Sequence, residues 1–311
     1  MCAIFGLLDY KGSLTAAQRL KIIKALGTAA EVRGTDATGI AFFQRNRLCI
    51  QKAAKPAHKM RYRIPAEAKF IMGHTRMTTQ GSADKNQNNH PFPGKAGNKT
   101  FALAHNGVLY NDRELRCERN FPKTDIETDS YIAVQLIELK KEVTFDSLRE
   151  MAEAVEGSFA FTILDQDNNL YFVKGENPLT IYHYPDLGIY LYASTTGILD
   201  HALDALWLDQ EYVIIQPRQG DILKIDRQGQ QSTATFDTSK IDWGWPFAGC
   251  AVRPHFVKHS DTQTDYSQTL KSIAALYGYD SGYVDELLEN GYALDEIEES
   301  IYRSEAAAWE R

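Results

Sequence analysis

The chain has 311 residues, of which 43% are hydrophobic and 24% charged, a balance typical of a soluble globular protein with one large domain and room for an appendage. No stretch approaches the roughly 18 apolar residues of a membrane span, and no basic segment followed by an apolar core indicates a secretory signal. The net charge of −7 arises in residues 261–311, which hold twelve acidic and three basic side chains, and no basic cluster interleaved with aromatic residues indicates a nucleic-acid partner.

Short apolar runs alternate with turns over the first 230 or so residues, which is typical of strands. Each run is rich in Phe, Ile, Leu, Tyr or Val and is bounded by Gly, Asp, Asn or Pro. The predicted strands are 4–8, 39–43, 48–52, 69–73, 100–104, 159–165, 170–174, 189–193 and 212–215. Turn residues at 165–169 predict a hairpin. A second hairpin is predicted to join 222–226 to 232–236.

Three amphipathic patterns predict helices at 15–30, 129–139 and 144–155, with Thr15 as the N-cap of the first. The elements run in the order strands, helix, strands, helices, strands. That order predicts an α+β fold in which helices pack on two sheets.

The chain is expected to divide into a main domain at 2–240, a loop or linker at 241–265 and an acidic helical tail at 266–311. The sequence of the tail predicts three short helices, at 266–277, 282–290 and 295–303. The last of them begins at Asp295, which is well placed to cap it. It has too few apolar residues for an independent core, so we expect it to pack on the main domain or on a partner.

Cys2 is the residue whose position carries the most chemistry. Methionine aminopeptidases generally remove Met1 when the next side chain is small, and removal would leave a thiol and a free α-amine on one residue. An α-amine with a pKa of about 7.7–8.0 is a usable base for a thiol nucleophile. The alternative, which the position alone favours, is a small buried residue at the start of an edge strand.

The four cysteines, which also include Cys49, Cys117 and Cys250, contain no C-x-x-C pair. Neither a zinc site nor a disulfide framework is therefore indicated, and a reducing, cytoplasmic location fits best. No metal and no cofactor are expected.

Polar clusters interrupt the strand pattern at several places. Each alone has a structural explanation, such as a solvated turn, a helix N-cap or a buried structural histidine. The clusters are Arg33-Gly34-Thr35-Asp36-Ala37-Thr38-Gly39, Gly73-His74-Thr75-Arg76-Met77-Thr78-Thr79-Gln80-Gly81, Asn89-His90-Pro91-Phe92, His105-Asn106-Gly107 and Glu127-Thr128-Asp129-Ser130.

In this order, and after Met1-Cys2-Ala3-Ile4-Phe5-Gly6, the clusters resemble the glutaminase domain of class II glutamine amidotransferases, which are N-terminal nucleophile (Ntn) hydrolases. Glucosamine-6-phosphate synthase and amidophosphoribosyltransferase carry such domains. The resemblance covers roughly residues 2–230 and includes the later segments 156–160, 174–179 and 193–194. It implies a four-layer αββα sandwich of two antiparallel sheets, here with a small C-terminal helical appendage.

The resemblance also implies roles for the residues in these clusters. Cys2 would be the nucleophile, with its own α-amine as base, and Arg33 would orient the amino terminus. Asn106 and the backbone N–H of Gly107 would form the oxyanion hole, where each donor is typically worth about 3–4 kcal/mol.

Substrate recognition is implied for a second group of residues. Arg76 would pair with the α-carboxylate of glutamine, and Asp129 would hold its α-ammonium. Thr79 and His90 match positions of the pocket wall.

Three residues depart from the family pattern. Ala3 stands in place of a Gly, Met77 in place of the Trp of the glucosamine-6-phosphate synthase branch, and Gln80 in place of its His. In that branch the Trp belongs to the gate between the glutaminase and synthase sites, so the resemblance does not imply a closely similar gate here.

The implied reaction releases glutamate and ammonia from glutamine through a thioester. The residues after 230 are too few for an acceptor domain, and no P-loop or G-x-G-x-x-G sequence is present. Ammonia would then pass to a separate acceptor protein, or the chain would act as a stand-alone amidohydrolase. Two alternatives remain open: another γ-glutamyl compound as substrate, or a non-catalytic glutamine-binding regulatory module. No membrane or nucleic-acid partner is expected, and a homo-oligomer stays open.

Overall fold

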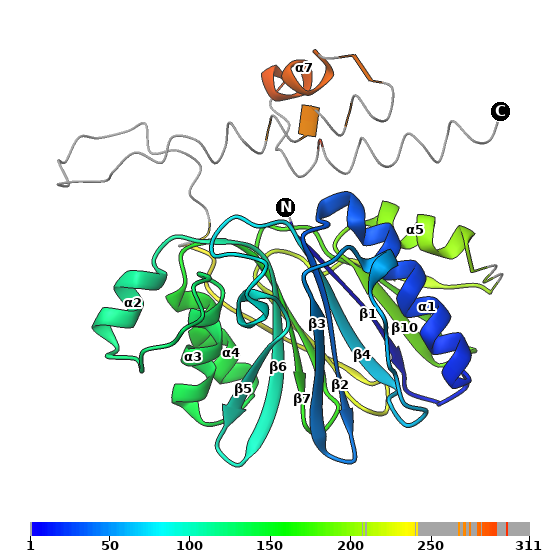
Figure 1. Ribbon diagram of the computed structural model, residues 1–311, viewed down its shortest axis with the longest axis horizontal. Helices are drawn as coiled ribbons and strands as arrows, with labels where there is room; N and C mark the ends of the chain where they lie inside the picture. Colours follow the sequence, from blue (N-terminus) through cyan, green and yellow to red (C-terminus); the bar gives the residue numbers. More distant parts are fainter. Residues whose placement is uncertain are drawn as a thin grey trace. The chain divides into compact units, whose positions relative to one another are not determined.

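Strands and helices occupy most of the chain up to residue 241 in the computed structural model (Figure 1). The structure describes residues 2–206, 208, 210–239, 241, 267, 270, 271, 274, 279, 280, 282–290 and 297. The chain divides into two units, Met1–Asp242 and Trp243–Arg311.

Two antiparallel sheets form the centre of the first unit. The first sheet has the order β11-β9-β10-β1-β4-β2-β3 and the second the order β13-β12-β8-β7-β6-β5. The strands of the first sheet are β1 (Ala3–Asp9), β2 (Ala37–Gln44), β3 (Arg47–Ala53), β4 (Phe70–Arg76), β9 (Thr180–Tyr184), β10 (Ile189–Ala193) and β11 (Val213–Ile215). Those of the second are β5 (Phe92–Ala96), β6 (Lys99–Leu109), β7 (Gly157–Asp165), β8 (Leu170–Lys174), β12 (Asp221–Ile225) and β13 (Gln231–Thr235).

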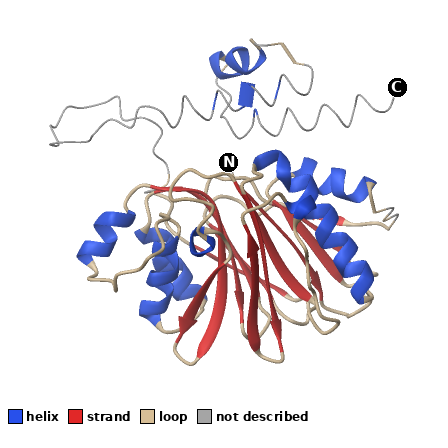
Figure 2. Cartoon of the chain, viewed as in Figure 1, coloured by secondary structure: helices blue, strands red, loops and turns tan. Residues whose placement is uncertain are grey.

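Helices cover the outer faces of both sheets (Figure 2). Helices α1 (Ala16–Ala29) and α5 (Thr196–Asp204) pack on the first sheet, and α3 (Tyr131–Lys140) and α4 (Phe145–Ala154) pack on the second, where the short α2 (Asp112–Glu118) joins them. Short 3₁₀ helices lie at η1 (Ala30–Arg33), η2 (Ala57–Lys59) and η3 (Asn86–Asn88). The predicted α+β fold with two antiparallel sheets is confirmed, and the layers follow the order αββα.

Strand β1 shows how the layers are held together. Phe5 and Leu7 point into the apolar layer beneath α1 and α5, whereas Ile4 and Leu8 enter the layer between the sheets. Alternate residues of a strand face opposite sides, so β1 is apolar on both faces and buried over its whole length. The chain therefore enters the molecule at the middle of a sheet, between β10 and β4.

Among the described residues, two strands and two α-helices were not predicted from the sequence: β5, β9, α2 and α5. Strand β5 contains Pro93 and Gly94, which weaken a strand pattern, and it lies at the edge of its sheet where Pro is tolerated. Helix α5 begins at a capping Thr195, whose Oγ1 accepts the N–H of Ile198 at 3.4 Å. Short elements of this kind depend on packing more than on local pattern.

A buried ion pair ties the end of β1 to α1. Nη1 of Arg19 lies 2.8 Å from Oδ2 of Asp9, and both side chains are almost completely buried. The carboxylate also accepts the N–H groups of Ser13 at 2.9 Å and Leu14 at 3.3 Å, while Arg19 donates to the carbonyl of Ala66. The network pairs the two buried charges and fixes the turn between the strand and the helix.

The second unit is described at fewer positions. Helix α7 (Tyr283–Glu289) lies within the predicted helix 282–290, and residues 267, 270, 271 and 274 are helical within the predicted helix 266–277. Nζ of Lys271 lies 2.7 Å from Oδ1 of Asp285, and the rings of Tyr279 and Tyr283 stack at 4.2 Å. Only Ile297 of the third predicted helix and Ile241 of the predicted linker are described. None of the helices formed by the described residues is long and apolar enough to cross a membrane.

We expect Arg19→Met to lower the free energy of unfolding by about 3–5 kcal/mol, because it leaves the Asp9 carboxylate buried without its counter-charge. Urea unfolding monitored by circular dichroism measures the change. The matched control is Lys99→Met, which breaks the solvent-exposed pair between Lys99 and Asp167 and should have a much smaller effect. Equal losses in the two variants would contradict a special role for the buried pair.

Candidate active site

Cys2 lies at the entrance to the central strand of the first sheet. Its neighbour Ala3 pairs with Thr75 of β4, which brings Cys2 to the end of β4 where Arg76 and Met77 follow. Sγ of Cys2 lies 3.5 Å from the carbonyl oxygen of Met77. Nε of Arg33, at the end of η1, donates to the carbonyl oxygen of Cys2 at 2.8 Å. Two segments distant in sequence therefore hold the backbone and thiol of this residue.

The surroundings of the thiol favour its protonated form. Burial raises the pKa of the Cys2 thiol above its ordinary value, although the positive charges of Arg76 and Arg33 act in the opposite direction. A thiol in this state needs a base within reach before it can act as a nucleophile.

Arg76 is buried at the end of β4 with its guanidinium held on two sides. Nη1 donates to Oδ1 of Asn89 at 2.7 Å, and Nη2 donates to the carbonyl oxygens of Gln80 at 2.5 Å and Gly81 at 3.2 Å. The residues 77–81 thus fold back over the arginine from which they start. Burial lowers the pKa of Arg76, and the neighbouring Cys2, Asp36 and Asp129 oppose that shift.

The segment after Arg76 is fastened to the turn before β2. The N–H of Asp36 donates to the carbonyl of Arg76 at 2.9 Å, and the N–H of Thr78 donates to Oδ2 of Asp36 at 2.7 Å. Gly34 packs against the same backbone, since a Cβ there would lie 2.4 Å from the carbonyl carbon of Arg76. Thr79 lies on this segment and is exposed.

Asn106 and Gly107 reach the same region from β6 of the second sheet. Gly107 has a φ of 142°, and a Cβ there would lie 2.0 Å from the carbonyl oxygen of Ser158 on β7, so only glycine fits. Nδ2 of Asn106 lies 3.4 Å from Oγ of Ser194, which also accepts the N–H of Ile4 at 2.9 Å. The amide of Asn106 is thereby linked to the strand that carries Cys2.

Asp129 lies just before α3, with its carboxylate buried. Oδ2 accepts the N–H of Leu109 at 2.6 Å, and Oδ1 accepts the hydroxyl of Ser130 at 3.4 Å. Burial raises the pKa of Asp129, whereas these hydrogen bonds lower it. The electrostatic interaction between Asp129 and Arg76 shows that a carboxylate and a guanidinium lie in the same region of the structure.

His90 lies in a stack of buried rings. Its ring centroid is 4.2 Å from that of His74 and 4.3 Å from that of Phe92. Nε2 of His74 donates to the carbonyl of His105 at 2.9 Å, and Nδ1 of His105 lies 2.8 Å from Oγ of Ser130. Burial lowers the pKa of all three histidines, to about 3 for His74 and His105. The three imidazoles are therefore neutral at physiological pH.

The structure thus unites several of the residues singled out in the sequence. Arg33 contacts Cys2 directly, and Cys2 contacts Met77, the neighbour of Arg76. Asn106 is linked through Ser194 to Ile4, two residues after Cys2, and Asp129 interacts electrostatically with Arg76. Thr79 lies on the exposed part of the 77–81 segment, and His90 lies in the buried stack. The hydrogen bonds made by Asn89, Asp36 and Ser194 were not predicted. All three residues occur within the motifs, but a sequence motif does not specify which side chains contact one another.

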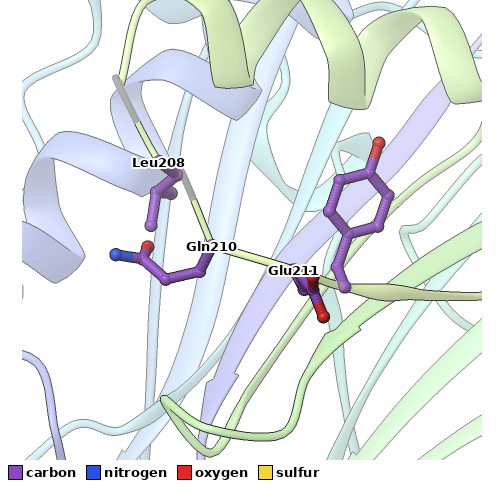
Figure 3. Close-up of a pocket in the computed structure, with 4 residues that line it drawn as sticks. Leu208, Gln210 and Glu211 are labelled. Atoms are coloured by element: carbon purple, nitrogen blue, oxygen red, sulfur yellow. The ribbon is translucent and has the colours of Figure 1, made fainter.

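A cavity of about 500 Å³ lies elsewhere, lined by Leu208, Gln210, Glu211 and Tyr212 (Figure 3). It adjoins β11, which is separated from β1 by β9 and β10 in the first sheet. This cavity is therefore not the site at Cys2. Within the described ranges, no group of three or more His, Cys, Asp or Glu side chains is placed to hold a metal ion.

A family model described as a glutamine amidotransferase domain matches residues 74–201. That range contains Arg76, Asn106 and Asp129, and the curated relatives extend the match to most of the chain. The chain carries a class II glutamine amidotransferase domain. The fold of two packed antiparallel sheets agrees with this assignment.

The relatives of this amidotransferase domain are longer proteins. Glutamine–fructose-6-phosphate aminotransferase (isomerizing) of Sulfurisphaera tokodaii is 28% identical over 275 residues, which cover 83% of this chain and 44% of that protein. The protein of the same name from Bacillus thuringiensis subsp. konkukian is 27% identical over 299 residues, covering 92% and 46%. This chain therefore spans less than half the length of the curated relatives it matches.

A solved structure shares the fold of the amidotransferase domain. Glutamine phosphoribosylpyrophosphate amidotransferase from B. subtilis, complexed with ADP and GMP, superimposes with a TM-score of 0.62 at 22% identity, over 77% of this chain and 50% of that one.

The neutral histidines couple stability to pH. Their folded-state pKa values lie below the ordinary value of 6.5, so between about pH 6.5 and pH 3 the unfolded chain binds protons that the folded protein does not. The stabilisation is present in full above pH 6.5 and is lost as the pH falls. At pH 5 each buried histidine should lower the free energy of unfolding by about 2 kcal/mol relative to pH 8.

We expect His90→Phe to reduce the loss of stability between pH 8 and pH 5 by about a third, since it keeps a ring in the stack and removes one of three titrating groups. Urea unfolding at both pH values measures the difference. His201→Phe, at an exposed position on α5, is the control and should leave the pH dependence unchanged. A wild-type dependence in His90→Phe would show that His90 binds a proton in the folded protein over the same pH range as in the unfolded chain, which would contradict its burial in the neutral form.

Proposed function

We propose that this chain hydrolyses the side-chain amide of glutamine through a thioester at Cys2, releasing glutamate and ammonia. The observation that carries the proposal is the convergence of a thiol, a buried guanidinium and an amide donor at adjoining strand ends. Sγ of Cys2 lies 3.5 Å from the carbonyl oxygen of Met77, directly after Arg76, and Asn106 reaches the strand of Cys2 through one hydroxyl.

The first half-reaction needs a base, because burial raises the pKa of the Cys2 thiol. Removal of Met1 would give Cys2 a free α-amine, with an ordinary pKa of about 7.7–8.0, that can accept the thiol proton. The thiolate then attacks the amide carbon, the C–N bond breaks, and the α-ammonium returns the proton to the departing ammonia. Water, deprotonated by the same amine, cleaves the thioester and frees glutamate.

The negative oxygen of each tetrahedral intermediate would be stabilised by Nδ2 of Asn106 and the N–H of Gly107. Donors that are already oriented need no reorganisation as charge develops, which makes this contribution large. The tight fit of Gly107 against Ser158 supports a fixed position for the second donor.

Arg76 and Asp129 would select a free amino acid. The guanidinium of Arg76 suits the α-carboxylate of glutamine, and the carboxylate of Asp129 suits the α-ammonium. Both side chains are at least nine-tenths buried, so each charge is weakly screened and gains from a partner of opposite sign. Thr79 and His90 remain predicted contributors to the pocket wall.

The acceptor of the ammonia is a question separate from the hydrolysis of glutamine. The names of the curated relatives describe the transfer of an amino group between glutamine and fructose 6-phosphate, and this chain spans less than half of their length. We propose that a separate protein in the cytoplasm accepts the ammonia made by residues 2–240. The acidic segment 266–311 is the part of the chain that we expect to contact it.

Purified protein with a verified free Cys2 amino terminus should release equal amounts of glutamate and ammonia from glutamine, as measured by coupled assays. Cys2→Ser should lower kcat at least about 10³-fold, because a hydroxyl with a far higher pKa replaces the thiol. The analogue 6-diazo-5-oxo-norleucine should add covalently to Cys2, as seen by intact mass.

Three outcomes would separate the alternatives. Turnover of a γ-glutamyl peptide but not of glutamine would change the substrate. Tight reversible binding of glutamine without turnover or adduct would indicate a regulatory module. An intact mass that retains Met1 in the cellular protein would contradict the proposed base.

Arg76→Lys and Asp129→Asn should each raise the KM for glutamine about 10- to 100-fold, because the first loses the bidentate geometry of the guanidinium and the second loses the charge of a hydrogen bond worth about 1.5–3 kcal/mol. Steady-state kinetics with glutamine measures the effect. Glutaramide, a diamide without either α-group, provides the control, because its slow hydrolysis should respond little to either variant. An unchanged KM in both variants would remove these residues from the substrate site.

A further inference from the structure

Ser194 lies where the two sheets meet. Its hydroxyl accepts the N–H of Ile4 at 2.9 Å, and its own N–H donates to the carbonyl of Ile4 at 3.0 Å. The same Oγ lies 3.4 Å from Nδ2 of Asn106, which comes from the other sheet. Ser194 is completely buried, so this hydroxyl is a fixed point between the strand of Cys2 and the side chain of Asn106.

The hydrogen bond to Ser194 uses one N–H donor of the Asn106 side chain. A carboxamide has two N–H donors. One directed at Ser194 fixes the plane of the group, and the second then points in a set direction for an incoming oxygen. The rotation of the Asn106 side chain is therefore limited before any substrate binds.

Asn177 acts on the neighbouring peptide group. Its Nδ2 donates to the carbonyl oxygen of Asn106 at 2.7 Å. That carbonyl and the N–H of Gly107 belong to one planar peptide unit, so fixing the oxygen fixes the direction of the N–H. A hydrogen bond accepted by the carbonyl also polarises the unit and strengthens the N–H as a donor.

The loop that carries Asn177 is itself held in place. Nζ of Lys174, at the end of β8, donates to the carbonyls of Gly175 at 2.8 Å and Glu176 at 3.0 Å. The N–H of Gly175 donates to the carbonyl of Phe159 on β7 at 3.0 Å. The turn therefore presents Asn177 to Asn106 from a defined position.

We propose that Ser194 and Asn177 are positioning residues, one for each donor of the oxyanion hole. Ser194 orients the side-chain N–H of Asn106, and Asn177 orients and strengthens the backbone N–H of Gly107. The proposal rests on the proposed hydrolysis of glutamine at Cys2. In this proposal neither Ser194 nor Asn177 touches the substrate. Each acts through the oxyanion-hole donor that it orients.

Kinetics of Ser194→Ala and Asn177→Ala with glutamine test the assignment. Each variant should lower kcat ~10-fold with KM changed less than about twofold, a smaller loss than the 10²–10³ expected for removal of a donor itself. Matched controls are Ser147→Ala and Asn169→Ala, which remove a buried serine hydroxyl in the first turn of α4 and a half-buried asparagine amide in the turn between β7 and β8. Both controls should keep the wild-type kcat.

A double-mutant cycle with Asn106→Ala separates the two routes. Ser194→Ala should cause no further loss in the Asn106→Ala background, because the group that it orients is gone. Asn177→Ala should still lower kcat ~10-fold there, because Asn106→Ala keeps the peptide carbonyl and the Gly107 N–H. Additive losses for Ser194→Ala, or none for Asn177→Ala, would overturn the corresponding half of the proposal.

Alkylation of Cys2 by iodoacetamide distinguishes an effect on the oxyanion from an effect on the thiol. Displacement of iodide at a saturated carbon forms no oxyanion, so the rate at Cys2, followed by peptide mass spectrometry, should stay within about twofold of wild type. A fall in alkylation that parallels the fall in kcat would show that the residues act on Cys2 or on the fold, and would overturn the proposal.

Nuclear magnetic resonance spectra of the amide groups test the positioning roles independently of the proposed function. If wild-type protein with a free Cys2 amine does not hydrolyse glutamine, the proposed function fails. In that case Asn177→Ala should still shift the ¹⁵N–¹H resonance of Gly107, and Ser194→Ala the side-chain amide of Asn106. Gly94 of β5 is the internal reference. Shifts at the two donors no larger than at Gly94 would overturn the positioning roles.

Discussion

Two antiparallel sheets pack face to face, and this packing sets where the polar strand ends lie. Apolar side chains from both sheets fill one shared layer, among them Ile4 and Leu8 of β1 and Phe172 of β8. Because that layer fixes the distance between the sheets, the strand ends on either side are brought to set positions. The thiol at the start of β1 and the amide of Asn106 on β6 are held together in this way.

Close backbone approach follows from the same packing. At Gly107 a side chain would collide with β7, and at Gly34 it would collide with the backbone after Arg76. Glycine at these points permits the polar segments to lie within hydrogen-bonding distance of one another. The loss of conformational entropy that glycine brings on folding is offset by the burial of the strands on both sides.

Burial also sets the charge state of the site. The buried histidines stay neutral, whereas Arg76 interacts electrostatically with both Cys2 and the carboxylate of Asp129. In a poorly screened environment such charges act strongly on an ionic ligand and on each other. The backbone carbonyls of Gln80 and Gly81 and the side chain of Asn89 hold the guanidinium in one orientation.

The alternation of apolar strands, the three main helices and the polar motifs at strand ends could be predicted from the sequence, because hydrophobic periodicity and turn chemistry are local patterns. The sequence also identified Cys2, Arg76, Asn106 and Asp129 as candidates. The sequence did not show that β1 lies between β10 and β4, that Ser194 contacts Asn106, or that the ring of His90 packs against those of His74 and Phe92. Those contacts join residues tens of positions apart, and they follow from how the sheets pair and pack, which no local pattern specifies.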